Sequence, residues 1–135
     1  MKTWIDKRDC EESFKIKNIY KRFADIPAKS KMLIVSPPII DKYIKSIPYG
    51  EFVEPVKMRK NLAKKYKADQ TCPVTTGIFL RIISEASFEE YKRYKDIEKI
   101  TPFWRAVYPS SKLASKLICG IDFIIQNQKK ENIEL

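Results

Sequence analysis

The stretch that decides the fold is SPPIIDKYIKSIPYGEFVEPVKMRKNLAKKYKADQTCPVTTGIFLRIISEA, residues 36–86. It predicts three helices, each with proline in the first turn, where the missing amide hydrogen is harmless. The first has Ser36 as its N-cap and isoleucines at helical spacing up to Ile47. Pro48-Tyr49-Gly50 then ends it in a turn.

The second helix is predicted to open at Glu54-Pro55. Met58, Leu62 and Tyr66 recur every four residues and mark its buried side, whereas the other positions are strongly basic. Residues 68–71 end this helix.

The third helix is predicted from Pro73 onwards. One of its faces is apolar, formed by Val74, Ile78, Ile82 and Ala86 with Phe79 and Ile83 beside them. Residues 87–95 are polar and either extend this helix or kink away from it.

Two segments precede these helices. Residues 32–35 are a short apolar run that predicts a strand or a docking segment. We interpret residues 1–31 as an N-terminal extension, in which Ile16, Ile19, Tyr20 and Phe23 are spaced to line one face of a short helix. Pro27 would end that helix, because the residue before a proline avoids the helical region.

The segments after residue 95 predict a small β-hairpin and a closing helix. Residues 100–107 look extended, 108–111 are a turn signal, and 112–117 would be the returning strand. A last helix follows Gly120. We therefore predict a mainly α protein with a small β-hairpin, a winged helix-turn-helix DNA-binding domain over residues 32–130, with residues 131–135 as a tail.

Composition limits the classes of function that this chain can have. The chain has 135 residues, the length of one domain, and a formal net charge of +10. Such a charge favours polyanions, nucleic acid first. The sequence has no histidine, which excludes Ser-His and Cys-His nucleophile pairs. Its three cysteines are widely spaced, so we expect no disulfide framework, no metal site and no cofactor. Without an apolar span or signal segment, we expect a cytoplasmic monomer with no membrane partner.

Several motifs resemble the DNA-binding half of the DNA-repair alkylguanine alkyltransferases, the methylated-DNA–protein-cysteine methyltransferases. Residues 47–51 read IPYGE, a turn of that family, and Leu62-Ala63 stand where the family has the same pair in its next helix. Residues 102–107, PFWRAV, fall where the family carries PCHRVV, and Cys119-Gly120 resembles the glycine pair before its last helix. The resemblance covers about residues 36 to 130. The chain also resembles, more closely, a branch of short alkyltransferase-family DNA-binding proteins. That branch pairs a segment like residues 68–79 with a later TPYWR, which here reads TPFWR over residues 101–105.

The departures from the family imply that the chain is not an enzyme. Phe103 occupies the position of the family's alkyl-accepting cysteine, and Trp104 that of its activating histidine. Alkyl transfer needs a thiolate and a positioned base, which this position lacks. Residues 74–76 stand where the family inserts an arginine in place of the flipped base, so base flipping of that kind is not expected either.

The resemblance and the charge pattern together give a set of candidate site residues. Those expected to contact double-stranded DNA are Thr75, Thr76, Gly77, Arg81, Lys57, Lys60, Ser110, Ser111, Lys112 and Lys116. Those expected to line a base pocket, or alternatively to fill the core, are Phe103, Trp104 and Arg105. The resemblance gives Arg105 a structural role, joining the hairpin to the core.

We therefore predict a non-enzymatic DNA-binding protein that senses alkylated or distorted DNA, or acts in transcription or nucleoid structure. Two alternatives stay open. One is a repair alkyltransferase with a displaced cysteine, for which Cys72 at a helix start is the candidate. The other is an RNA- or protein-binding adaptor on the same scaffold.

Overall fold

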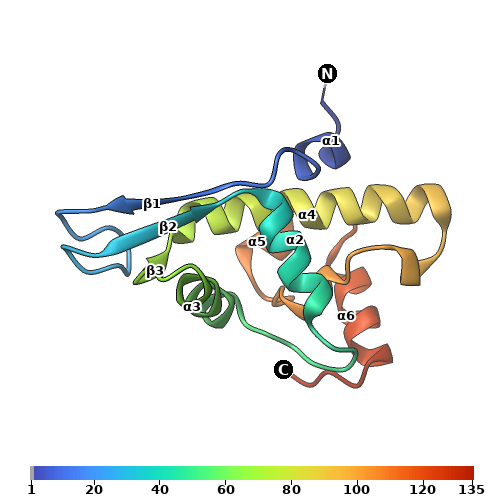
Figure 1. Ribbon diagram of the computed structural model, residues 1–135. Helices are drawn as coiled ribbons and strands as arrows, with labels where there is room; N and C mark the ends of the chain where they lie inside the picture. The colour runs from blue at the N-terminus through green and yellow to red at the C-terminus, as the bar shows by residue number, and fades with distance from the viewer. Residues whose placement is uncertain (1) are drawn as a thin grey trace.

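The computed structural model describes residues 2–135 and shows an α-rich domain with a small three-stranded sheet (Figure 1). In chain order its elements are α1 (Trp4–Arg8), β1 (Phe14–Asn18), β2 (Lys31–Val35), α2 (Pro37–Ser46), α3 (Pro55–Lys65), β3 (Gln70–Thr71), α4 (Pro73–Tyr94), the short 3-10 helices η1 (Ile97–Lys99) and η2 (Phe103–Arg105), α5 (Lys112–Lys116) and α6 (Ile121–Lys130).

The three helices predicted from residues 36–86 are confirmed. Each begins with proline at its first turn, at Pro37, Pro55 and Pro73, and α4 runs on to Tyr94 as one helix. The helix predicted after Gly120 is α6. Local signals suffice for these elements, because caps, prolines and apolar spacing act within a few residues.

The region before α2 differs from its prediction. Residues 14–18 form strand β1 instead of a helix, and they pair antiparallel with β2, with Phe14 opposite Val35 and Asn18 opposite Lys31. The predicted strand over residues 32–35 is confirmed as β2. We call residues 14–35 the arm, because this hairpin projects from the helices at one end of the molecule (Figure 1). Strand β3 adds to β2 in parallel.

The predicted hairpin between residues 100 and 117 is wrong. Residues 103–105 form the 3-10 helix η2, and residues 112–116 form helix α5, capped by the Ser111 hydroxyl on the Ala114 amide at 3.1 Å. Thr101 orders the start of this segment, because its hydroxyl donates to the buried carboxylate of Asp41 and its carbonyl accepts from Ser87. These contacts come from α2 and α4, so they override the extended preference of the local sequence.

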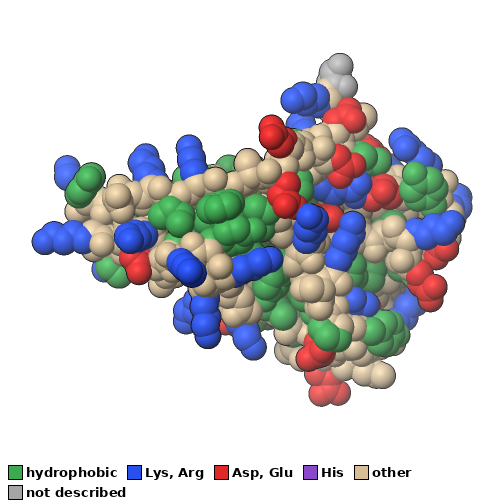
Figure 2. Space-filling model, viewed as in Figure 1, with side chains coloured by type: hydrophobic (Ala, Val, Ile, Leu, Met, Phe, Trp, Pro, Cys, Tyr) green, Lys and Arg blue, Asp and Glu red, His purple; other side chains and the backbone are tan. Residues whose placement is uncertain are grey.

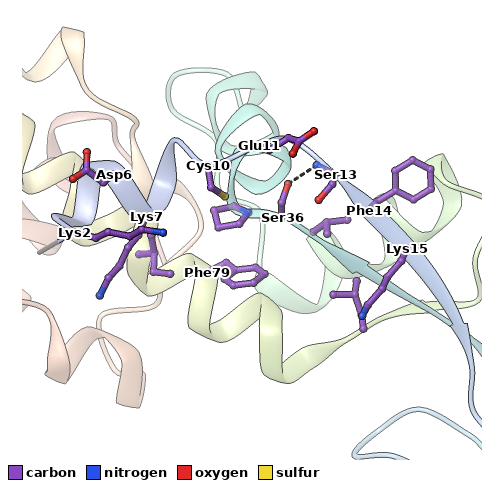
Figure 3. A pocket seen from close by; sticks show the side chains of 14 residues that line it. Lys2, Asp6, Lys7, Cys10, Glu11, Ser13, Phe14, Lys15, Ser36 and Phe79 are labelled. Atoms are coloured by element: carbon purple, nitrogen blue, oxygen red, sulfur yellow. Dashed lines mark hydrogen bonds between the residues drawn. The ribbon is translucent and has the colours of Figure 1, made fainter.

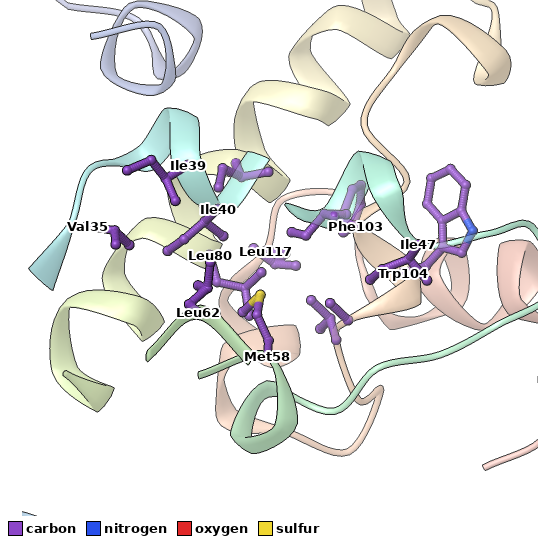
Figure 4. Close-up of a cluster of buried hydrophobic side chains, with 14 of the residues drawn as sticks. Val35, Ile39, Ile40, Ile47, Met58, Leu62, Leu80, Phe103, Trp104 and Leu117 are labelled. Carbon is purple, nitrogen blue, oxygen red and sulfur yellow. The ribbon is translucent and has the colours of Figure 1, made fainter. Parts of the chain in front are cut away.

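The core lies between α2, α4, η2 and α6, and Figure 4 shows part of it. The predicted apolar face of α4 is buried only in part. Ile83 and Ala86 are buried as predicted, but Val74 and Ile78 are each 53% exposed, and Leu80, which lies outside the predicted face, is buried. Apolar residues surround this helix at its start, so spacing alone could not select the buried side.

The N-terminal residues pack on this domain. Helix α1 lies against α4, where the buried Arg8 pairs with Glu90 and Asp9. Ser13 continues the contact, because its amide donates to the Ser36 hydroxyl at 2.8 Å, at the N-cap of α2. The arm is therefore held at both of its ends by the helical body.

Candidate nucleic-acid interface

The net positive charge of the chain lies at one end of the molecule. The arm and residues 55–71, which contain α3 and β3, hold twelve Lys and Arg residues against two acidic ones and so carry the whole net charge of +10. The rest of the chain has fifteen residues of each sign. We call these two segments the basic surface, and Figure 2 shows their Lys and Arg side chains in blue along the arm and over α3.

The two acidic residues of the basic surface both serve the fold. The Asp25 carboxylate accepts from the Arg59 guanidinium, at 2.9 and 2.7 Å. The Asp69 carboxylate accepts from the Lys31 amide at 2.8 Å, and the Asp69 amide donates back to the Lys31 carbonyl at 2.9 Å. Both links join the arm to the α3–β3 segment, so the negative charges hold the two basic segments together.

Arg59 is the one basic residue here that is buried, with 6% of its surface exposed. Its Nε donates to the Thr71 carbonyl at 3.0 Å, and the Thr71 hydroxyl donates to the Arg59 carbonyl at 2.7 Å. The hydrogen bonds from Arg59 lower the pKa of Asp25. Burial raises this pKa, but its effect is smaller. The other eleven Lys and Arg side chains of the basic surface are exposed.

The sequence-predicted residues Lys57 and Lys60 belong to this surface. Both are exposed on α3, whose opposite side buries Met58 and Leu62 as predicted. The exposed lysines of the same segment are Lys57, Lys60, Lys64, Lys65 and Lys67. Regularly spaced ammonium groups on one helix are suited to following a phosphate backbone.

The predicted residues of α4 lie outside the basic surface. The side chains of two of them, Thr76 and Arg81, already contact other groups of the protein. Thr76 is buried and its hydroxyl donates to the Cys72 carbonyl at 2.6 Å. The Nε of Arg81 lies 3.7 Å from the Glu85 carboxylate, and its guanidinium lies 5.5 Å from the Trp4 ring centre. Thr75 is half-buried and Gly77 is exposed.

The four predicted residues of the expected wing belong to α5 and the turn before it. The Ser111 hydroxyl caps α5 and donates to the Tyr108 carbonyl, whereas Ser110, Lys112 and Lys116 are exposed. Gly77, Arg81 and Lys116 do come together, because they line one hollow of about 430 Å³ with Trp4 and Lys7. Lys57 and Lys60 are not among the residues of that hollow.

A further hollow, of about 630 Å³, lies between α1, the base of the arm and α4 (Figure 3). Figure 3 shows the Phe79 ring at its floor and Asp6, Glu11, Lys7 and Lys15 around it. Because carboxylates stand among the ammonium groups, this hollow favours a phosphate chain less than the basic surface does.

Phe103 is fully buried, so its ring offers no face to a base in this structure. It packs against the Phe123 ring, with centres 6.0 Å apart and planes 11° apart, and edge-on to Trp104. Its position is that of a residue which fills the core, the second of the two roles expected for it. Trp104 is also buried, and Trp104 and Arg105 line a surface hollow of about 390 Å³ beside Tyr49.

Arg105 has structural contacts, but they are not those that the resemblance implies, because residues 103–105 and 112–116 are helical and form no hairpin for it to join to the core. Its guanidinium donates to both carboxylate oxygens of Glu131, at 2.8 and 3.1 Å, and to the Ile47 carbonyl at 2.8 Å. Glu131 also accepts from the Trp104 indole at 2.7 Å and the Gly50 amide at 2.9 Å. Gly50 has φ +85°, a conformation in which a side chain is strained. The turn at 47–51 and the 102–107 motif therefore meet at one buried carboxylate.

Sequence reasoning missed the arm as part of the site. Its signal is the alternation of apolar and basic residues in Phe14-Lys15-Ile16-Lys17, which is typical of a strand with one face in water. The periodicity of residues 16–23 matched a helix as well, and the pairing that selects the strand comes from β2.

The three cysteines differ in their surroundings. Cys72 is buried at the N-cap of α4, and burial together with the charge of Glu85 raises the pKa of Cys119 to about 11. Cys10 is exposed. A thiol that stays protonated at neutral pH is a poor nucleophile.

Comparison with models of protein families, with curated proteins and with solved structures finds no match to this chain. The resemblance to the alkyltransferases therefore stays a prediction. Within residues 2–135, none of the helices combines the length and apolar character needed to cross a membrane.

Proposed function

We propose that this protein binds double-stranded DNA without acting on it chemically, and that it does so through the basic surface. The observation that carries the proposal is the segregation of charge: two segments hold the whole net charge of +10, and both of their carboxylates are engaged in joining them. A field of this kind attracts phosphates and releases counterions on binding.

The shape of the basic surface supports the same proposal. A two-stranded ribbon fits the major groove, and the arm is such a ribbon, with α3 fixed beside it by Arg59 and Asp25. In the winged helix-turn-helix arrangement, α4 would enter the groove and a later hairpin would flank it. We propose instead that the arm is the β element that approaches DNA and that α3 follows the backbone.

The experiment is a polarisation titration of a labelled duplex at several salt concentrations. Lys57→Gln/Lys60→Gln and Lys15→Gln/Lys17→Gln each remove two charges from the basic surface. Lys129→Gln/Lys130→Gln removes the same charge from α6 and is the matched control. We expect the first two to lower the slope of log affinity against log salt by about 0.9 for each phosphate that is no longer neutralised, and the control to change it little. Equal weakening in all three variants, or no binding at low salt, would refute the proposal.

Lesion sensing is tested in the same titration with an alkylguanine duplex. Of the residues predicted for a base pocket, the Phe103 ring is covered, whereas Trp104 and Arg105 line the surface hollow beside Tyr49, which is where we would expect a flipped base. Tighter binding to the alkylated duplex would support sensing, and equal affinity would exclude it. Structured RNA as competitor tests the adaptor alternative, which predicts that RNA displaces the duplex at lower concentrations than unlabelled duplex does.

A further inference from the structure

Exposed aromatic rings gather on the arm. Five aromatic side chains are exposed among residues 2–135. Three of them lie in the arm, within the ten-residue stretch 14–23. Their exposed fractions are 52% for Phe14, 81% for Tyr20 and 39% for Phe23. Large apolar groups in water are unfavourable unless a partner covers them, so a cluster of this kind marks a contact surface.

The Phe14 ring contacts the ring of Tyr66, the residue that directly follows α3. The Phe14 and Tyr66 ring centres are 4.5 Å apart with planes tilted by 47°, and the Lys65 ammonium lies 5.7 Å from the centre of the Tyr66 ring. Alternate residues of a strand share a face, so Ile16, itself 40% exposed, extends the same side of β1. Figure 2 shows apolar side chains in green over β1 and α3, with Lys and Arg in blue around them.

A small hollow adjoins the Tyr66 ring. It measures about 240 Å³, and its lining includes Tyr43, Asn61, Lys65 and Tyr66. The Glu12 carboxylate, which also lines it, is paired with the Lys42 ammonium. The Asn61 amide donates to the Tyr43 hydroxyl at 2.6 Å, which places two hydrogen-bonding groups at its wall. Ring faces, an amide and ammonium groups are the groups that protein sites use for an unpaired nucleotide.

We propose that the arm and the adjoining end of α3 bind single-stranded DNA, with bases stacking on Phe14, Tyr66 and Tyr20 and phosphates following the lysines. The inference rests on the proposed DNA-binding function and names the form of DNA that these rings prefer. In a duplex the base faces are already stacked, so exposed rings gain little from it. The eleven exposed Lys and Arg side chains around the rings favour a polyanion over an apolar protein partner.

The test compares a labelled oligothymidine strand with a duplex. Tyr20→Ala and Phe14→Ala each remove one ring from an exposed position, and Tyr94→Ala, with its ring 50% exposed at the end of α4, is the matched control. We expect each arm variant to weaken strand binding about tenfold and duplex binding clearly less, with the salt slope near wild type, because stacking involves no counterion release. Phe14→Tyr keeps an aromatic ring at this position, so its strand affinity should stay near that of the wild type. Thermal unfolding of each variant verifies that the arm is folded.

Strand affinity that survives the double variant Phe14→Ala/Tyr20→Ala overturns the inference, as does tighter binding of an oligouridine RNA strand than of the DNA strand. The proposed function fails on a different result. It falls if Lys57→Gln/Lys60→Gln leaves duplex binding unchanged, whatever the aromatic variants do.

Discussion

The guanidinium of Arg59 on α3 donates to both carboxylate oxygens of Asp25, in the loop of the arm, at 2.9 and 2.7 Å. The arginine is buried, whereas 56% of the Asp25 side chain is exposed. One buried cation therefore fixes the position of the loop at the far end of the arm. Bidentate pairs of this geometry are more directional than single ionic contacts.

Asp25→Asn is expected to loosen the arm. The decrease in stability should be about 1 kcal/mol, since water can reach the partly exposed site. Amide hydrogen exchange over residues 19–30 should become faster, and the helices should be unaffected. Asp122→Asn, a carboxylate removed from the exposed start of α6, is the control. Unchanged exchange in the loop would show that the pairing of β1 with β2 is enough to hold it.

Glu131→Gln is expected to cost about 3 kcal/mol of stability, because it leaves the Arg105 guanidinium in a buried site without a charged partner. Denaturant unfolding at neutral pH measures this. The decrease should exceed that of Glu134→Gln, which changes an exposed carboxylate three residues away.

The same carboxylate makes stability depend on pH. Burial raises the pKa of Glu131, but the hydrogen bonds from Arg105, Gly50 and Trp104 outweigh it, so the net pKa lies below its ordinary value of 4.5. A lowered folded-state pKa adds stability above the unfolded value and loses it as the pH falls through the folded value. Unfolding free energy should therefore decline below about pH 4.5 in the wild type, with a shallower decline in Glu131→Gln. Parallel curves would contradict this assignment.

Phe103→Cys restores the residue type of the alkyltransferase motif without restoring its chemistry. The exchange removes most of a fully buried ring, and we expect stability to fall by about 3 kcal/mol. Intact mass after incubation with alkylated DNA should show no alkyl gain. Ile118→Cys, at a position 67% exposed, is the near-neutral control for stability. An alkyl group localised to residue 103 would show that the site opens to DNA.

The three native thiols should differ in reactivity. Cys10 is exposed and should react first with iodoacetamide, whereas Cys72 is covered by the fold. With a pKa of about 11, only about one Cys119 in a thousand is a thiolate at pH 8, and its rate should rise with pH up to that value. Peptide mass spectrometry resolves the sites. Labelling of Cys72 as fast as Cys10 would revive the displaced-cysteine alternative.

The sequence by itself determined α2, α3, α4 and α6. Pro37, Pro55 and Pro73 set three helix starts, and Gly120 precedes the fourth. It also determined the basic side of α3, because Met58 and Leu62 recur at the helical period and leave the lysines outward. These signals act over neighbouring turns and need no partner from elsewhere in the chain.

Only the tertiary structure decided the rest. Residues 14–18 fit a helix or a strand until β2 supplies their hydrogen bonds, and residues 112–116 become a helix within a fold that Thr101 and Asp41 help to order. The segregation of charge also appears only in the folded chain, since the arm and α3 are separated by the whole of α2 in sequence. Contacts such as Arg59 to Asp25 join residues 34 positions apart, and no local pattern specifies which distant groups will meet.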